Sequence, residues 1–257
     1  MIAPAHIQTL ETRLQSRADT RGIMISAAGV FDHFGARMAL EAGYDALLVG
    51  GAALALSRYG SPMAQLLSPE AITEALYVVR DAGDMPLIAD AADGFGNALH
   101  VAATVRAFEF AGASVVQISD RPLRRRDRSE GPRFAVAEMI GKLKAALDAR
   151  RYCLIAAVVE IESADSPSSV VDRAAAYIEA GADLIIMRSE GEPLNLSSMG
   201  NTSFLPAPVG FEWGQRLKPA PEADLLAKWY NVSLYPFLFP QVLHGARDAL
   251  KASRTTY

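Results

Sequence analysis

The fold is decided by three similar stretches of sequence, Glu41-Ala-Gly-Tyr-Asp45, Phe110-Ala-Gly-Ala-Ser114 and Glu179-Ala-Gly-Ala-Asp183. Each stretch ends a helical pattern and begins an apolar run, and its glycine lies where the end of a helix needs a left-handed residue. The three glycines are spaced by 69 residues, an interval that holds two strand–helix units of about 35 residues. Because eight such units close into a (β/α)8 barrel, the spacing predicts an α/β barrel of the TIM type.

Continuous apolar runs, which indicate parallel strands covered on both faces, occur eight times. They are Gly22–Ala27, Asp45–Val49, Pro86–Ala91, Ser114–Ser119, Tyr152–Glu160, Asp183–Arg188, Phe204–Val209 and Val232–Phe237. Helical patterns alternate with them at Phe31–Ala42, Pro69–Asp81, Ala98–Ala111, Ala135–Ala149, Ser168–Ala180, Glu222–Tyr230 and Pro240–Ser253. This alternation predicts a parallel sheet. A doubly wound open sheet is the alternative, but eight strands in so short a chain favour closure.

The chain of 257 residues is 51% hydrophobic, with a net charge of −4. We expect one barrel domain over residues 1–257, with residues 1–21 as an N-terminal helical extension. The charge excludes a global nucleic-acid footprint, and no apolar run reaches the roughly 18 residues of a membrane helix. The N-terminus has no secretory pattern. The single Cys153 excludes a disulfide framework and suits a reducing compartment. We therefore expect a cytoplasmic protein, and from the charge and the apolar runs we expect no nucleic-acid or membrane partner.

A barrel of this kind carries its chemistry at the carboxyl ends of the strands. Asp90 ends a wholly apolar run, and Asp120, Glu160 and Arg188 end or follow the next three predicted strands. A buried, unpaired acid is costly, so Asp90 is predicted to be a metal ligand or a base, with a cap or a loop salt bridge as the alternative. Glu160 and Arg188 can pair with each other, or Arg188 can bind a substrate carboxylate.

The loops after the strands supply the remaining candidates. Residues predicted to bind substrate are Gly50, Gly51, Ala52, Asp93, Gly94, Phe95, Asn97 and Trp213. The segment Arg121–Arg128 contains five arginines and is interpreted as a solvated loop, as a loop that neutralises an anionic substrate, or as a nucleic-acid contact. Cys153 begins a strand and is predicted to be buried and inert. No metal or triad role is expected for the four histidines.

Several of these stretches resemble one superfamily. Ala28-Gly-Val-Phe-Asp32, Ala36–Ala52, Ile88–Ala98, Ile118–Asp120 and Ala180–Arg188 are similar to segments of the isocitrate lyase / phosphoenolpyruvate mutase superfamily. The resemblance covers roughly residues 20–190. It implies a modified (β/α)8 barrel, a homo-oligomer (dimer or tetramer) that often exchanges a helix, and Mg²⁺ that binds a 2-oxo acid or its enolate. It also implies that a C–C or C–P bond is made or broken.

The resemblance assigns roles to some residues, and at other positions this chain departs from the family's pattern. Gly51 and Ala52 match the backbone amides that hold a substrate carboxylate, and Asp90 matches the metal ligand. Where the family keeps charged residues, this chain has Met63, Ala92, Ser119 and Val158, and Arg124–Arg128 replaces the lyases' cysteine loop. The chain is therefore no ordinary isocitrate or methylisocitrate lyase. Asp93 and Arg188 are candidates to compensate for the lost charges.

The sequence thus predicts a divergent lyase that acts on a small anionic substrate, a 2-oxo or dicarboxylic acid. It would cleave a C–C or C–P bond, or decarboxylate, through an enolate. The predicted catalytic residues are Asp90, Asp120, Glu160 and Arg188, with Mg²⁺ on Asp90. The first alternative is a non-catalytic or metal-independent barrel that binds a more apolar ligand or a partner. The second is altered chemistry on a larger substrate, in a pocket lined by Phe95, Trp213 and Tyr235.

Overall fold

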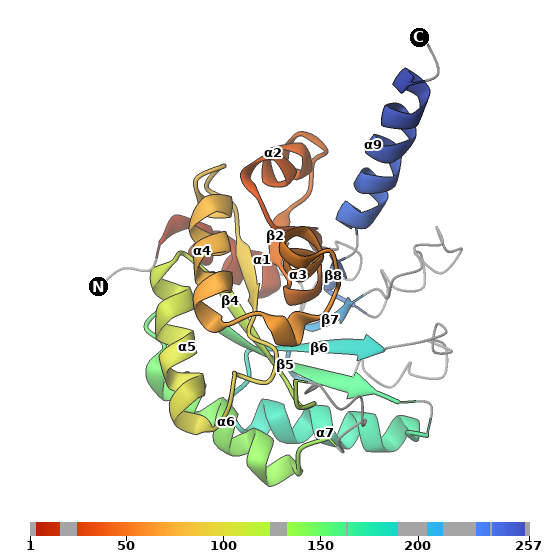
Figure 1. The fold of residues 1–257 in the computed structure, drawn as a ribbon. Coiled ribbons are helices and arrows are strands. Elements are labelled where there is room, and N and C mark those ends of the chain that lie inside the picture. The colour runs from red at the N-terminus through yellow and green to blue at the C-terminus, as the bar shows by residue number, and fades with distance from the viewer. Residues whose placement is uncertain are drawn as a thin grey trace.

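The computed structural model describes residues 4–15, 25–123, 133–162, 164–189, 205–212, 230–236 and 238–254. Within these residues, eight parallel strands form a closed barrel in chain order, with β8 pairing back onto β1 (Figure 1). The strands are β1 Ile25–Val30, β2 Ala46–Val49, β3 Leu87–Asp90, β4 Val115–Ser119, β5 Leu154–Ile161, β6 Leu184–Ser189, β7 Val209–Glu212 and β8 Val232–Tyr235. The predicted barrel is confirmed.

Helices follow most of the strands, and most of these helices cover the outside of the barrel. They are α1 Ala5–Gln15, α2 His33–Glu41, α3 Gly51–Tyr59, α4 Pro69–Arg80, α5 Ala98–Phe110, α6 Val136–Ala149, α7 Pro167–Glu179 and α9 Leu238–Arg254, with a 3-10 turn η1 at Ala64–Leu66. Helix α3 was not predicted, because Gly50-Gly51-Ala52 was interpreted only as a loop. The predicted helix Glu222–Tyr230 lies outside the described residues except for Tyr230.

The prediction for the seventh strand was wrong in its position. The apolar run Phe204–Val209 was expected to form it, but β7 begins only at Val209 and ends at Glu212. Pro206 and Pro208 lie inside the predicted run. Because proline has no N–H group to donate to a ladder, pairing starts after the second proline, whose carbonyl accepts the N–H of Ile185 at 3.0 Å.

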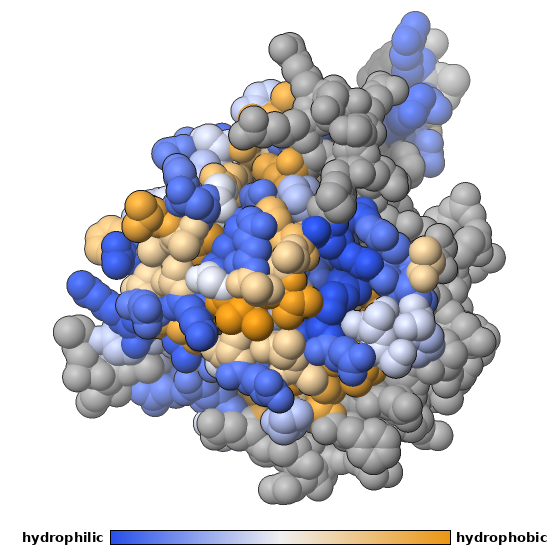
Figure 2. All heavy atoms as spheres, turned by 90° about the horizontal axis from the view of Figure 1, so that it is seen from below, coloured by the Kyte–Doolittle hydropathy of each residue, from blue (hydrophilic) through white to orange (hydrophobic). Residues whose placement is uncertain are grey.

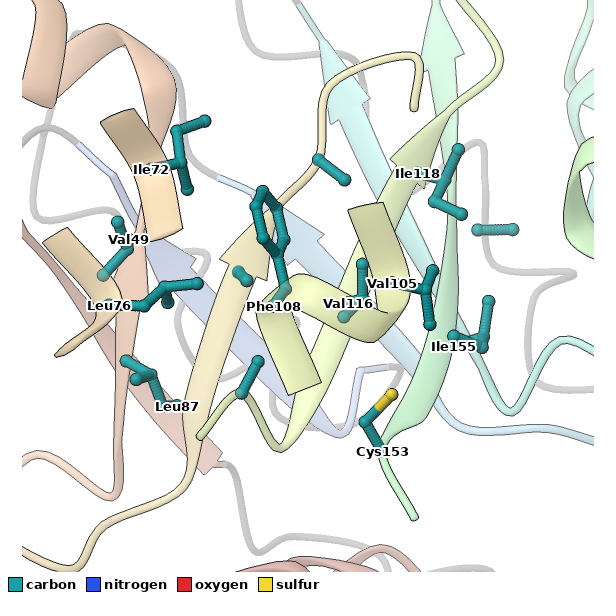
Figure 3. Close-up of a cluster of buried hydrophobic side chains, with 14 of the residues drawn as sticks. Val49, Ile72, Leu76, Leu87, Val105, Phe108, Val116, Ile118, Cys153 and Ile155 are labelled. Atoms are coloured by element: carbon teal, nitrogen blue, oxygen red, sulfur yellow. The ribbon is translucent and has the colours of Figure 1, made fainter. Parts of the chain in front are cut away.

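The core has two layers separated by the sheet. Inside the barrel, buried residues such as Ile88, Val158 and Ile186 pack together with Leu10 and Leu14 of α1, so α1 closes the amino-terminal end of the barrel. Between the sheet and the helices lies the larger layer (Figure 3), where Phe108 and Val105 of α5 meet Leu87, Val116 and Ile155.

Cys153 belongs to this outer layer, as Figure 3 shows, and its side chain is fully buried just before β5. Burial raises the pKa of its thiol, which keeps the nucleophilic thiolate scarce. The predicted burial of Cys153 is therefore confirmed, and the residue lies at the end of the barrel opposite to the predicted chemistry.

Two surface features complete the fold. Helix α9 projects away from the barrel (Figure 1), and its residues 245–254 are all exposed. On the face that Figure 2 presents, hydrophobic residues gather in the middle and hydrophilic residues surround them. Among the described helices, none combines the length and the apolarity that crossing a membrane requires.

Candidate active site

A layer of polar side chains lies inside the barrel near the carboxyl ends of its strands. Side chains two residues apart on a strand point to the same face. Because Ile88, Val158 and Ile186 point into the barrel, Asp90, Glu160 and Arg188 point inward one layer further along. By the same rule Gln117 and Ser119 point into the barrel, because they follow the inward-facing Val115 of β4 in steps of two residues. The strand pairing sets Arg188 beside Glu160 on one side and beside Glu212 on the other.

Arg188 is the centre of this layer. One Nη atom of its guanidinium donates to Glu160 Oε1 at 3.1 Å. The other Nη atom donates to Asp90 Oδ2 at 3.1 Å and to Glu212 Oε2 at 2.8 Å. Four strands, β3, β5, β6 and β7, thus contribute to a single cluster of one cation and three carboxylates. We call these four residues the Arg188 cluster.

The Arg188 cluster is secluded and its outer hydrogen bonds fix its geometry. Glu160 also accepts a hydrogen bond from the Ser119 hydroxyl at 3.0 Å, and Glu212 accepts one from Gln117 Nε2 at 3.3 Å. The side chains of Glu160 and Glu212 are only 6% and 9% exposed. Removing these two carboxylates from water favours their neutral forms.

These surroundings shift the acid–base behaviour of the cluster. Burial raises the pKa of Glu160 and of Glu212, although Arg188 acts in the opposite direction on both. Burial alone would lower the pKa of Arg188, but the three carboxylates raise it well above its usual value. The cluster therefore holds a permanent cation beside two carboxyl groups that retain protons more readily than exposed ones.

A cavity of about 370 Å³ opens above the cluster. Asp90, Ser119, Glu160, Arg188 and Glu212 form its polar side together with Arg121. Its other lining residues are mostly apolar and include Leu48, Met63, Ile72, Phe95, Leu123 and Pro236. The volume fits a small organic acid, which could lay its charged groups against one wall and its carbon skeleton against the other.

The amino-terminal end of α3 forms a third wall. Gly50, Gly51, Ala52 and Ala53 line the cavity, and Gly50 caps α3 without any side-chain hydrogen bond. The first N–H groups of a helix have no partner within the helix and attract anions. The predicted place for a substrate carboxylate, at Gly51 and Ala52, therefore opens into the same cavity as the Arg188 cluster.

The loop after β3 is strained where it borders the cavity. Ala92 and Phe95 adopt positive φ angles of 48° and 60°, which residues other than glycine rarely do. The Asp93 carboxylate holds this shape by accepting the N–H groups of Phe95 at 3.0 Å and of Leu123 at 3.1 Å. Asp93 therefore organises the loop and is not in the cavity lining.

Other predicted site residues also lie away from the cavity. Asn97 caps α5, where its side chain accepts the N–H groups of Leu99 and His100, and a side chain on Gly94 would collide with Val101 of the same helix. Asp120 is fully buried, but its carboxylate binds Arg173 and Tyr177 of α7 and the Glu160 N–H group. Trp213 and most of the arginine segment lie outside the described residues.

Glu212 was missed by the sequence prediction, although it takes part in the centre of the site. It ends the run Val209-Gly-Phe-Glu212, in the same way that Asp90 ends its own apolar run. The signal was present, but the misplaced seventh strand ended three residues before it. Correcting that strand for its two prolines would have placed an inward-facing acid at the mouth of the barrel.

Polar groups at the carboxyl end of a closed parallel barrel, beside a cavity, define an enzyme of the TIM-barrel class. The family model described as phosphoenolpyruvate phosphomutase matches residues 15–251. The chain therefore belongs to the phosphoenolpyruvate phosphomutase family, within the isocitrate lyase / phosphoenolpyruvate mutase superfamily. The predicted superfamily is confirmed.

Two curated relatives and one solved structure add detail. The chain is 33% identical to the 2,3-dimethylmalate lyase of Eubacterium barkeri, over 91% of this chain and 83% of the lyase. It is 33% identical to an oxaloacetate decarboxylase of Pseudomonas fluorescens, over 63% of this chain but only 57% of the decarboxylase. A phosphonopyruvate hydrolase in complex with oxalate and Mg²⁺ is 27% identical, with a TM-score of 0.78, over 98% of this chain and 85% of the hydrolase. The names of the two curated relatives support the predicted lyase class.

The described part of the chain can be tested for a Mg²⁺ site around Asp90. Asp90 Oδ1 accepts the Ala92 N–H group at 2.9 Å, and Oδ2 is paired with Arg188. Among the described residues, no group of three or more His, Cys, Asp or Glu side chains is placed to hold a metal ion. Because both oxygens of Asp90 are bound by protein donors, and one of these donors is a cation that repels a metal ion, the predicted metal site on Asp90 does not fit the residues as they lie.

Proposed function

We propose that this protein cleaves a C–C bond in a small dicarboxylic acid, through an enolate. The observation that carries the proposal is the Arg188 cluster, which faces a cavity with an anion-binding helix end in a family whose named relatives include lyases and decarboxylases of small acids. A fixed cation near a developing negative charge stabilises the transition state. Gly51 and Ala52 would hold one carboxylate of the substrate through their backbone N–H groups.

The chemistry of such a cleavage assigns roles to the buried acids. An ionised carboxylate of the Arg188 cluster would remove the proton from the 2-hydroxyl group, and the C2–C3 bond would break. Its electron pair would move onto C3 and the adjacent carboxylate, leaving an enolate and a 2-oxo acid. A protonated carboxyl group would then deliver a proton to C3. The raised pKa values of Glu160 and Glu212 suit them to carry these protons.

The apolar wall of the cavity indicates which acids fit. Met63 replaces an expected carboxylate and lies in the wall together with Ile72 and Phe95. An alkyl-substituted acid would bury its methyl groups against this wall, where each buried CH₂ group contributes about 0.8 kcal/mol. We therefore propose an alkyl-substituted malate as the substrate class.

Decarboxylation of a 2-oxo dicarboxylic acid is the second candidate. It is favoured by the similarity to oxaloacetate decarboxylase, because loss of CO₂ also leaves an enolate that needs only one proton. The same Arg188 cluster would serve both reactions. The two candidates differ in their products, since only decarboxylation releases CO₂.

The test is a substrate panel of malate, 2-methylmalate, 2,3-dimethylmalate and oxaloacetate. For the three malates the released 2-oxo acid is measured as its dinitrophenylhydrazone, and CO₂ is measured for all four acids, because oxaloacetate is itself a 2-oxo acid. We expect the alkylated malates to yield a 2-oxo acid without CO₂, and Arg188→Gln to lower kcat/KM by about 100-fold or more. The control is Arg150→Gln, which breaks an arginine–aspartate pair at the opposite end of the barrel. If the malates yield no 2-oxo acid and oxaloacetate yields no CO₂ above its spontaneous rate, the proposal is wrong.

A further inference from the structure

We infer that the guanidinium of Arg188 takes the place of a divalent cation, so that the site binds and polarises its anionic ligand without a metal ion. The inference rests on the proposed function in one respect, namely that an organic acid binds in this cavity. It goes beyond that proposal because it names the electrophile and denies a metal requirement. The argument has three steps, from position, from charge and from hydrogen-bonding capacity.

The first step is the position of the guanidinium. Asp90, which the family resemblance matches to a metal ligand, has its Oδ2 atom 3.1 Å from Arg188 Nη. The same guanidinium binds Glu160 and Glu212, on strands β5 and β7. A positive group is thus already held where carboxylates from three strands converge.

The second step is the balance of charge around that position. Met63, Ala92 and Ser119 line the cavity, at positions where the family resemblance leads us to expect acids. Fewer acids attract a divalent cation less strongly. A metal ion on Asp90 would also lie next to the guanidinium, and two like charges so close repel each other. The loss of the acids and the presence of Arg188 are therefore consistent with a single change, the exchange of a metal ion for a side chain.

The third step is the capacity of Arg188 to bind a ligand as well as its partners. A guanidinium has five N–H groups in a rigid plane, and three hydrogen bonds to the carboxylates are formed. Its Nε atom is buried and has no partner among the described residues. A planar donor with N–H groups in reserve can bind the oxygens of a carboxylate or enolate, as a cation that bridges two oxygens would.

The experiment uses oxalate, a planar dianion that mimics an enolate, with the full-length protein after dialysis against EDTA. Binding is followed by calorimetry and by the rise in melting temperature. We expect oxalate to bind equally well in EDTA and in millimolar Mg²⁺. We also expect no stoichiometric binding of Mn²⁺ in electron paramagnetic resonance titrations. Binding of oxalate that appears only with Mg²⁺ or Mn²⁺ would overturn the inference, as would one Mn²⁺ per chain that Asp90→Asn removes.

Variants connect the result to the side chain. Arg188→Gln removes the cation, and we expect it to weaken oxalate binding in EDTA by at least about tenfold. Arg188→Lys keeps the charge without the planar fork and serves if the glutamine variant does not fold. We expect it to retain part of the affinity. The control Arg150→Gln should bind oxalate as the wild type does. Unchanged binding by folded Arg188→Gln overturns the inference.

The two proposals fail in different ways. If the wild type binds oxalate in EDTA but cleaves none of the four acids of the panel, the metal-free site stands and the proposed reaction falls. If cleavage is found only after Mg²⁺ is added, the proposed reaction stands and the inference falls.

Discussion

At the residue scale, the burial of Glu160 and Glu212 makes the free energy of unfolding depend on pH. Burial raises the pKa of both carboxyl groups above the usual value of 4.5. Above that value the folded protein therefore binds more protons than the unfolded chain. This contribution to the free energy of unfolding is fully present below the unfolded pKa and is lost as the pH rises through the folded pKa.

The variant Glu212→Gln tests this dependence. It removes one group with a raised pKa, so we expect its melting temperature relative to the wild type to be higher at about pH 8 than at about pH 5. Arg188 favours the ionised form of Glu212, but its effect is already contained in the pKa, which is raised on balance. Glu74→Gln is the control, because Glu74 is an exposed acid paired with Arg58. A pH-independent difference for Glu212→Gln would contradict the assignment.

Single residues also mark the limit of prediction from the sequence. Asp90, Glu160 and Arg188 could be found because each ends an apolar run, where a barrel exposes its functional groups. That all three meet Glu212 at one guanidinium could not be found, because it depends on the true position of β7 and on Asp90 of β3 reaching across the barrel to Arg188 of β6. Asp93 and Asn97 were predicted to bind substrate because they lie in a loop after a strand, yet their side chains bind neighbouring N–H groups.

At the scale of elements, strand β7 and helix α3 show what local patterns leave open. The prolines before β7 look like part of an apolar strand when only hydropathy is considered, although they cannot complete a ladder. Gly50 and Gly51 look like a turn, although a glycine can cap a helix. The repeated helix ends at Gly43, Gly112 and Gly181 were predicted correctly, and all three adopt positive φ angles.

Asp120 connects three elements, since it directly follows β4 and its carboxylate binds both β5 and α7. Its carboxylate accepts hydrogen bonds from the Glu160 N–H group and the Tyr177 hydroxyl, each at 3.0 Å, and pairs with Arg173. We expect Asp120→Ala to lower the free energy of unfolding by about 3 kcal/mol, because the Glu160 N–H group and the Tyr177 hydroxyl lose their acceptor and Arg173 keeps only Asp165 as a carboxylate partner.

Urea denaturation measures this loss. Asp172→Ala, on the exposed side of the same helix, is the control and should change stability by less than about 0.5 kcal/mol. Equal midpoints for the two variants would show that Asp120 does not hold these elements together. If folded Asp120→Ala loses kcat while its KM is unchanged, the displaced Glu160 backbone explains the loss, since Asp120 itself does not reach the cavity.

At the scale of the whole molecule, the barrel could be predicted because it is repeated. The same alternation of strand and helix occurs in each unit, so a wrong prediction for one unit, such as the position of β7, does not change the predicted architecture. The cavity has no such redundancy. Its walls come from the ends of six strands and the start of α3, and each wall depends on the placement of a few side chains.

The exposed surface of helix α9 leads us to predict that copies of this chain form a homo-oligomer. Its residues 245–254 are all exposed, and Leu250 is 72% exposed. Most helical stability in proteins comes from packing of an apolar face, so we propose that a second copy of this chain covers α9. We expect light scattering to find a dimer or tetramer, which Leu250→Asp weakens. Leu99→Asp, at a comparably exposed leucine of α5, is the control. A monomeric wild type would contradict this.

The three unlike walls of the cavity have a consequence for stereochemistry. The α3 end, the Arg188 cluster and the apolar side offer three different contacts to three different groups on one tetrahedral carbon. Two mirror-image forms of an alkylated malate cannot both satisfy all three, because exchanging two groups sets a methyl against Arg188 or a carboxylate against Ile72. The enzyme should therefore consume one enantiomer of a racemic substrate and leave the other behind.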